Sequence, residues 1–313
     1  MRWRIAISAL VGLGAGSFCF FLVHSLHEGA GDFSWAIHLV RQLLARQTPY
    51  DTPLEQYPLT AGLFALPFVR LPPEFAAGLF YGLSSSLLAF GLTRHGYHRL
   101  LVFLAYPYWV GLLTVQWSTV IAASAFFPLL LPVTMAKPQV GLPVFLTHCN
   151  RRSLLACIGV ALLSLIVMPR WPLLWIGQMG YYQHFIAVLV LPGPLVLLAL
   201  MRYRERDARL LFLTSLMPQR WFFDTFILWL IPKSRREILV TVFFSWCCGI
   251  WRWYHPPQSF TQVGRWIVLS TYLPMLLIVL LRETPPKVSP DELARRARCT
   301  SSDEILRLPP SRS

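Results

Sequence analysis

The sequence predicts an all-α protein, a polytopic bundle of transmembrane helices that leaves little material for a soluble domain. The composition indicates this class, because 55% of the residues are hydrophobic and only 13% are charged, whereas an average soluble domain has ~25% charged residues. The pattern along the chain agrees, since apolar residues fall in long blocks separated by short basic loops.

The apolar blocks predict about ten membrane spans, several of them shorter than the ~20 residues that a lone helix needs. Such short spans survive only inside a bundle, where neighbouring segments satisfy the backbone. Pro107, Pro128, Pro132 and Pro218 interrupt the blocks and leave their ends uncertain by several residues. The predicted spans are residues 5–26, 74–93, 99–113, 116–133, 153–169, 185–201, 208–218, 221–232, 237–252 and 264–282.

The basic clusters between the blocks predict the orientation, because arginine and lysine are enriched in cytoplasmic loops. Both termini are expected in the cytoplasm of a multi-pass protein of the inner (plasma) membrane, with loops 27–57 and 170–184 outside. Residues 137–150, which include Lys137, must then dip into the membrane from the cytoplasmic side and return. The cytoplasmic clusters lie at 2–4, 94–99, 151–152, 202–209 and 233–236.

Other classes of protein are disfavoured by the distribution of charges and cysteines. The net charge of +14 comes with no basic stripe or recognition motif, so nucleic acid is not an expected partner. The six cysteines are scattered without a metal-binding spacing, so no metal site and no cofactor are expected. Residues 1–283 are predicted to form the transmembrane domain, and the proline-rich residues 284–313 a mobile cytoplasmic tail.

The first outer loop predicts an amphipathic helix on the membrane surface. Apolar residues recur there at helical spacing, with polar residues on the other face. Asp32 stands just before this helix, where glycines allow a sharp turn. Asp32 is therefore either an N-cap or a functional carboxylate. The apolar positions are Phe33, Ile37, Val40, Leu43 and Leu44.

Five short features occur in order over residues 1–150, and together they carry a resemblance. They are Gly31-Asp32, Gln47-Thr48-Pro49-Tyr50-Asp51, Tyr57-Pro58-Leu59, Val115-Gln116-Trp117 and Lys137-Pro138-Gln139. This order resembles that of membrane glycosyltransferases of the GT-C superfamily, and most of all glycosyltransferase family 87. The chain departs from the usual family pattern at Gln47 and Val115, where glycine is common, and in having one proline after Tyr57.

The resemblance implies an enzyme that transfers a sugar from a polyprenyl-phosphate carrier to an acceptor at the outer membrane face. Mannose is the usual sugar of family 87. The implied partners are a lipid-linked sugar donor, a glycan or glycolipid acceptor and membrane lipids. In an inverting transfer, a carboxylate deprotonates the acceptor hydroxyl, and Asp32 matches the family's acidic position. Substrate-contacting roles are expected for Tyr50, Tyr57, Gln116 and Tyr182.

A phosphate leaving group requires cationic or hydrogen-bonding groups, and the outer-side candidates are Arg220, His184, Arg252 and His255. Each has an alternative structural interpretation. Arg220 can form an i, i+4 pair with Asp224 that fixes a hairpin. Arg252, His255 and the residues around His184 can belong to an aromatic belt at the membrane boundary.

Two motifs leave further alternatives open. Lys137 lies on the cytoplasmic side in the predicted topology, so it is expected to cap a helix end or bind a lipid phosphate, away from an outer active site. Two other classes of function remain beside the transferase. The chain could be an inactive GT-C-like assembly protein, or a lipid or solute transporter, although no internal repeat supports transport.

Overall fold

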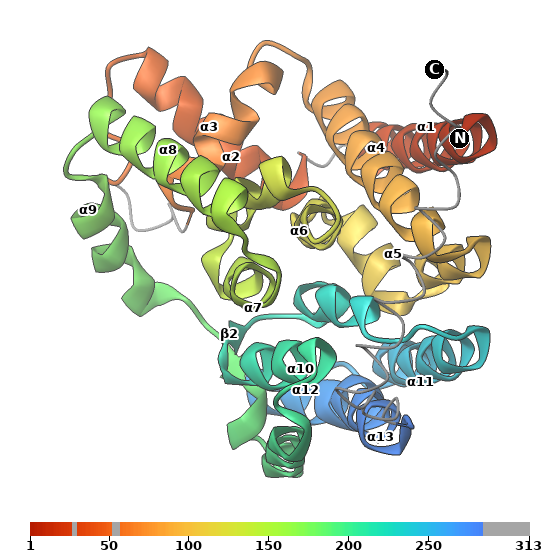
Figure 1. Cartoon of the computed structure of the whole chain (residues 1–313). Helices are drawn as coiled ribbons and strands as arrows, with labels where there is room; N and C mark the ends of the chain where they lie inside the picture. Colours follow the sequence, from red (N-terminus) through yellow and green to blue (C-terminus); the bar gives the residue numbers. More distant parts are fainter. Residues whose placement is uncertain (27–29, 52–56, 284–313) are drawn as a thin grey trace, which may run out of the picture. The chain divides into compact units, whose positions relative to one another are not determined.

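The computed structural model describes residues 1–26, 30–51 and 57–283, and these are mostly helical (Figure 1). The predicted tail 284–313 lies outside the described residues. The α-helices are α1 (Arg2–Leu26), α2 (Gly31–Leu44), α3 (Leu59–Ala65), α4 (Pro73–Leu92), α5 (Tyr106–Leu113), α6 (Ser118–Ser124), α7 (Pro138–His148), α8 (Arg151–Val167), α9 (Trp171–Gln178), α10 (Arg206–Leu216), α11 (Arg235–Tyr254), α12 (Phe260–Ile267) and α13 (Leu273–Leu281).

Tighter helical segments connect or extend these helices. They are the 3-10 segments η1 (Leu66–Phe68), η2 (Thr93–His95), η3 (Tyr97–Leu104), η4 (Pro128–Ala136), η5 (Met179–Tyr181), η6 (Ala187–Leu189), η7 (Gly193–Arg202) and η8 (Phe222–Leu230), and the π-helical turn η9 (Val268–Tyr272). Strands β1 (Phe185–Ile186) and β2 (Pro218–Gln219) pair antiparallel, with Phe185 opposite Gln219.

Three helices are long and apolar enough to cross a membrane: Arg2–Leu26, Pro73–His95 and Phe260–Leu281. They correspond to the predicted spans 5–26, 74–93 and 264–282. The pair α8 and α9 would add a fourth if the two count as one span, although they are bent by 93°. Prolines shorten other apolar blocks, as where Pro128 begins η4 after the chain becomes extended at Phe127.

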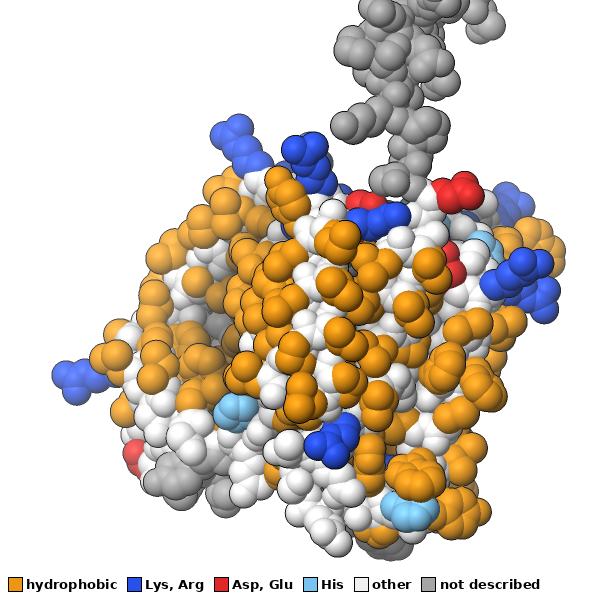
Figure 2. All heavy atoms as spheres, turned by 90° about the horizontal axis from the view of Figure 1, so that it is seen from below, with side chains coloured by type: hydrophobic (Ala, Val, Ile, Leu, Met, Phe, Trp, Pro, Cys, Tyr) orange, Lys and Arg blue, Asp and Glu red, His pale blue; other side chains and the backbone are white. Residues whose placement is uncertain are grey.

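Large apolar side chains are exposed on several helices, which is typical of a protein whose surroundings are apolar. Figure 2 shows hydrophobic side chains in a broad band on one face, with arginine and lysine side chains near its borders. Together with the three long apolar helices, this surface indicates a membrane protein. Exposed examples are Leu195, Leu198 and Met201 on η7, Phe243 and Trp251 on α11, and Leu277 on α13.

Helices α1 and α4 pack along much of their length through small residues. A Cβ added to Gly16 would lie 2.7 Å from the carbonyl oxygen of Gly78, and one added to Gly78 would lie 2.8 Å from that of Gly16. Glycine is thus required for this close approach of two backbones, a common arrangement between membrane helices. The packing fixes the end of α1, from which the chain leads to α2.

The segment between Gln116 and Lys137 returns to its starting point. Lys137 Nζ lies 2.8 Å from Gln116 Oε1, so α6 and η4, which pack on each other, form a hairpin. At 1.5 Å per residue, the seven-residue α6 is far shorter than a bilayer core. The prediction that put Lys137 on the side opposite loop 27–57 is therefore wrong, because the block 116–133 does not make a simple crossing.

Candidate active site

The turn before α2 places Asp32 in the site. Gly31 has φ +51°, and the Asp32 backbone N–H donates to the Thr114 carbonyl oxygen at 2.9 Å. The helix begins at Gly31, and its N-cap residue is Ala30, with no side-chain capping bond. The capping alternative for Asp32 is thus wrong: the residue lies in the first turn, where the helix dipole favours a negative charge.

The predicted helix is confirmed in its position, and three of its five predicted apolar positions are buried, whereas Leu43 is partly buried and Leu44 is exposed. Phe33, Ile37 and Val40 are buried, whereas His38 and Arg41 on the other face are exposed. The apolar face packs mainly on α3. Next to Asp32 in the first turn, Phe33 stacks on Phe80 of α4, with 4.0 Å between ring centroids.

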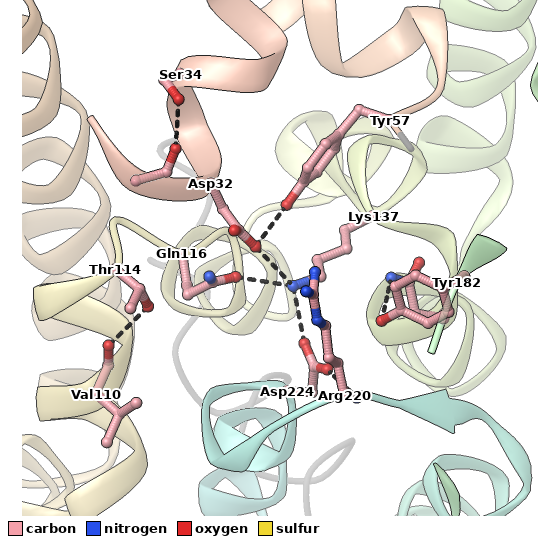
Figure 3. A network of polar contacts seen from close by, with 12 residues as sticks. Asp32, Ser34, Tyr57, Val110, Thr114, Gln116, Lys137, Tyr182, Arg220 and Asp224 are labelled. Atoms are coloured by element: carbon pink, nitrogen blue, oxygen red, sulfur yellow. Dashed lines mark hydrogen bonds and ion pairs between the residues drawn. The ribbon is translucent and has the colours of Figure 1, made fainter. Parts of the chain in front are cut away.

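Asp32 points toward a cluster of polar side chains from distant parts of the chain (Figure 3). Its Oδ2 atom accepts a hydrogen bond from the Tyr57 hydroxyl at 2.9 Å and lies 3.6 Å from Lys137 Nζ. With 27% of its side chain exposed, Asp32 is the accessible carboxylate of the cluster.

Lys137 is the centre of the cluster, although only 5% of its side chain is exposed. The ammonium lies 2.9 Å from Asp224 Oδ1, donates to Gln116 Oε1 at 2.8 Å and lies 4.6 Å from the centre of the Phe223 ring. A buried ammonium is stable only when it is paired and hydrogen-bonded. Lys137 has both kinds of partner.

Asp224 is completely buried and faces two partners. Its second oxygen, Oδ2, accepts the backbone N–H of Arg220 at 2.8 Å. The predicted i, i+4 side-chain pair between Arg220 and Asp224 is thus not formed: Asp224 accepts the Arg220 backbone N–H, and its charge is paired with Lys137. Among the described residues, the Arg220 guanidinium makes no ion pair with a carboxylate, and it extends toward Asp32 and Lys137 (Figure 3).

Asp32, Tyr57, Lys137 and Arg220 line a cavity of about 150 Å³. Burial first, and then the Asp32 carboxylate, hold the pKa of Tyr57 well above its usual value. Burial foremost also raises the pKa of Tyr182, whose hydroxyl accepts a hydrogen bond from Gln139 Nε2 at 3.2 Å. Both phenols are therefore neutral at physiological pH. The lining residues are Asp32, Trp35, Tyr57, Pro58, Ala136, Lys137, Gln139, Tyr182 and Arg220.

Two of the predicted substrate-contacting residues lie behind the cavity wall. The Tyr50 hydroxyl donates to the Tyr57 carbonyl oxygen at 3.1 Å, and Gln116 is fully buried beneath Lys137. Neither lines the cavity. They position Tyr57 and Lys137, which do.

Three of the four predicted phosphate-binding residues do not line the cavity. The His184 Nδ1–H donates to the Tyr182 carbonyl oxygen at 2.7 Å. Arg252 donates to the Tyr106 hydroxyl at 3.0 Å and stacks over the Trp221 ring. His255 stacks on Trp251, with 3.9 Å between ring centroids.

Sequence reasoning missed Trp35 and took Lys137 and Gln139 for structural residues. Trp35 lies three residues after Asp32, so it shares a helix face with Asp32, and this spacing was the available signal. For Lys137 and Gln139 the available signal was the motif Lys137-Pro138-Gln139. This motif belongs to the same ordered set of features as Asp32 and Tyr57. The predicted topology, which places Lys137 on the cytoplasmic side, argued against grouping it with Asp32.

The cluster combines two carboxylates with two cations. Lys137 lies between Asp224 and Asp32, and Arg220 is available to an incoming anion. Such a site can accept a proton from a hydroxyl and stabilise a negative leaving group. In the part of the chain that the structure describes, no three His, Cys, Asp or Glu side chains are grouped so that they could hold a metal ion.

No family model matches the sequence, and no curated protein and no solved structure matches it.

Proposed function

We propose that this protein is an inverting membrane glycosyltransferase that uses a polyprenyl-phosphate sugar, with Asp32 as the general base. One observation carries the proposal: residues of separate motifs meet at one cavity. The Asp32 carboxylate contacts the side chains of both Tyr57 and Lys137, and Gln116 holds Lys137 from behind. These are the positions on which the resemblance to the GT-C superfamily rests.

In the proposed reaction, an acceptor hydroxyl binds beside the exposed edge of Asp32 and gives its proton to the carboxylate. The hydroxyl oxygen attacks the anomeric carbon from the face opposite the carrier. The bond from that carbon to the phosphate oxygen breaks, and the phosphate leaves with the electron pair. Arg220 stabilises the phosphate, which needs no proton because it is a good leaving group.

Lys137 and Asp224 set the electrostatics of this step. Asp224 lies closer to the Lys137 ammonium than Asp32 does, at 2.9 Å against 3.6 Å. Lys137 is therefore paired mainly with Asp224, which leaves the Asp32 carboxylate for the acceptor hydroxyl. The Tyr57 hydroxyl orients the carboxylate without supplying charge, since the phenol is neutral.

The membrane topology that belongs to this function keeps both termini cytoplasmic and loop 27–57 outside. In our proposal, α6 and η4 form a re-entrant hairpin on the outer side, and α7 leads the chain back toward Arg151 and Arg152. About ten crossings then remain, in the inner membrane. In a variant without native cysteines, Thr48→Cys should react with a membrane-impermeant thiol reagent in intact cells, and Glu205→Cys should not. The reverse pattern would invert the topology.

The function is tested by incubating the purified protein with a panel of labelled polyprenyl-phosphate sugars and glycolipid acceptors. We expect consumption of one donor and a product whose anomeric configuration is opposite to that of the donor. A retained configuration would exclude direct attack assisted by Asp32. If no donor is consumed but a labelled lipid moves across proteoliposome membranes, the transporter alternative would replace the transferase. If neither activity is found, a non-catalytic assembly protein would be favoured.

A further inference from the structure

A second, apolar hollow adjoins the charged cavity. We name it the α8–α9 groove; it has a volume of about 380 Å³. It shares Pro58 with the charged cavity. Its residues Met135 and Pro138 also flank Ala136 and Lys137 of the cavity along the chain. The groove is lined by Pro58, Thr60, Thr134, Met135, Pro138, Leu142, Phe145, Cys157, Ile158, Ala161, Trp171 and Trp175.

The outer wall of the α8–α9 groove is formed by the bent helix pair. The Trp171 indole N–H donates to Ser164 Oγ at 3.1 Å, so the polar atom of this ring is already satisfied. The ring lies 6.1 Å from that of Trp175, centroid to centroid. Gln178 at the end of α9 donates to the Tyr50 carbonyl oxygen at 3.1 Å. The wall is thus tied to the loop behind Tyr57, and it presents apolar faces inward.

A larger apolar hollow of about 650 Å³ lies between α1 and α4 and serves as a comparison. Its lining includes Ala9, Gly12 and Gly78, and none of its described lining residues lines the charged cavity. Of these two hollows along the described residues, the α8–α9 groove is therefore the one that offers a ligand a charged and an apolar subsite together. Any general membrane lipid could occupy the α1–α4 hollow.

We propose that the α8–α9 groove binds the hydrocarbon chain of a single-chain lipid monophosphate, whose phosphate lies on Arg220. This inference rests on the proposed function and identifies where the carrier of the donor binds. The charges favour it, because Lys137 is already paired with Asp224 and Asp32, whereas Arg220 has no carboxylate partner among the described residues. The apolar lining favours it, because a buried chain gains affinity in proportion to the area removed from water.

The test uses a long polyisoprenyl monophosphate that carries a photoreactive diazirine on its chain. After illumination with the detergent-purified protein, labelled peptides are identified by mass spectrometry. We expect label on α8 and α9 and not on α1 or α4. Ala161→Trp fills the groove and should lower the labelling at least ~10-fold, as should Arg220→Gln. The matched control Ala9→Trp, in the α1–α4 hollow, should label like the wild type.

Several results would overturn the proposal. These are equal labelling of the two hollows, unchanged labelling of Ala161→Trp, and competition by a two-chain phospholipid or an unphosphorylated polyprenol as strong as by the monophosphate. If Ala161→Trp does not fold, as judged by its thermal midpoint, Ile158→Trp replaces it. The assay needs no sugar transfer. Labelling of the groove in a protein without transferase activity would support the lipid site and reject the proposed function. Transferase activity without labelling of the groove would support the proposed function and reject the lipid site.

Discussion

Lys137 and Lys233 each pair with an aspartate from a distant segment, yet their surroundings differ sharply. The Lys137 side chain is 5% exposed and its partner Asp224 is completely buried. The Lys233 side chain is 59% exposed, and it pairs with Asp207 in the first turn of α10. In sequence both lysines count as single positive charges near the end of an apolar block. What distinguishes Lys137, which lines the cavity, from Lys233, which lies in an exposed loop, is the burial of the side chain.

The difference in burial has an energetic consequence. Around Lys233, water and salt screen the interaction, so such a pair contributes ~0–1 kcal/mol. In the buried Lys137–Asp224 pair, loss of either member leaves the other charge buried without its main partner, which costs ~3–5 kcal/mol. The first pair belongs to the basic loops that set the orientation of a membrane protein. The second holds together segments that are far apart in the chain.

The largest effect is expected for Lys137→Met. This change leaves Asp224 buried without its cation and should lower the free energy of unfolding by ~3–5 kcal/mol. Denaturation in detergent, followed by circular dichroism, measures it. The double variant Lys137→Met/Asp224→Asn removes both charges and should recover much of the loss. If Lys137→Met were no more destabilising than Lys233→Met, burial would not make the Lys137–Asp224 pair more important for stability than the exposed Lys233–Asp207 pair.

A smaller loss is expected for Gly31→Ala, which tests how the backbone places Asp32 in the cluster. An alanine at φ +51° costs ~1–2 kcal/mol, and its Cβ would also collide with the Thr114 carbonyl oxygen. Gly159→Ala is the matched control, because nothing lies within 4 Å of a Cβ added on that helix. It should stabilise slightly. Equal thermal midpoints for the two variants would contradict the strained turn.

The smallest effect is expected for Lys233→Met. Because water screens the exposed pair with Asp207, the free energy of unfolding should fall by no more than ~1 kcal/mol. The loss should shrink further at high salt. Unfolding curves at low and high ionic strength measure both quantities. A loss as large as that of Lys137→Met, or one insensitive to salt, would remove the contrast between the two lysines.

Local features of the site could be predicted from sequence. The 3.6-residue period of apolar side chains predicts α2, and the glycine before Asp32 predicts the turn that presents it. The long apolar blocks predict α1 and α4, since their composition alone decides whether a helix can cross a bilayer. These features depend on neighbours within a few residues, which a sequence displays directly.

The pairing of the charges could not be predicted in the same way. Lys137 was assigned to the wrong side because the charge pattern assumes that every apolar block crosses the membrane, whereas α6 and η4 turn back. Arg220 was a correct candidate for the cavity, but His184, Arg252 and His255 have similar aromatic and basic surroundings in sequence and do not line it. Which of them reaches the cavity depends on tertiary packing.

The central claim is that the Asp32 carboxylate acts as the base, and one pair of variants tests it most directly. Asp32→Asn keeps the size and the hydrogen bond from Tyr57 but removes the basicity, so transfer from the donor found in the panel should fall ~100- to 10,000-fold. Asp51→Asn, in the exposed turn of the same loop, should retain nearly full activity, and both variants should keep the wild-type unfolding midpoint. Full transfer by a folded Asp32→Asn variant would contradict the account.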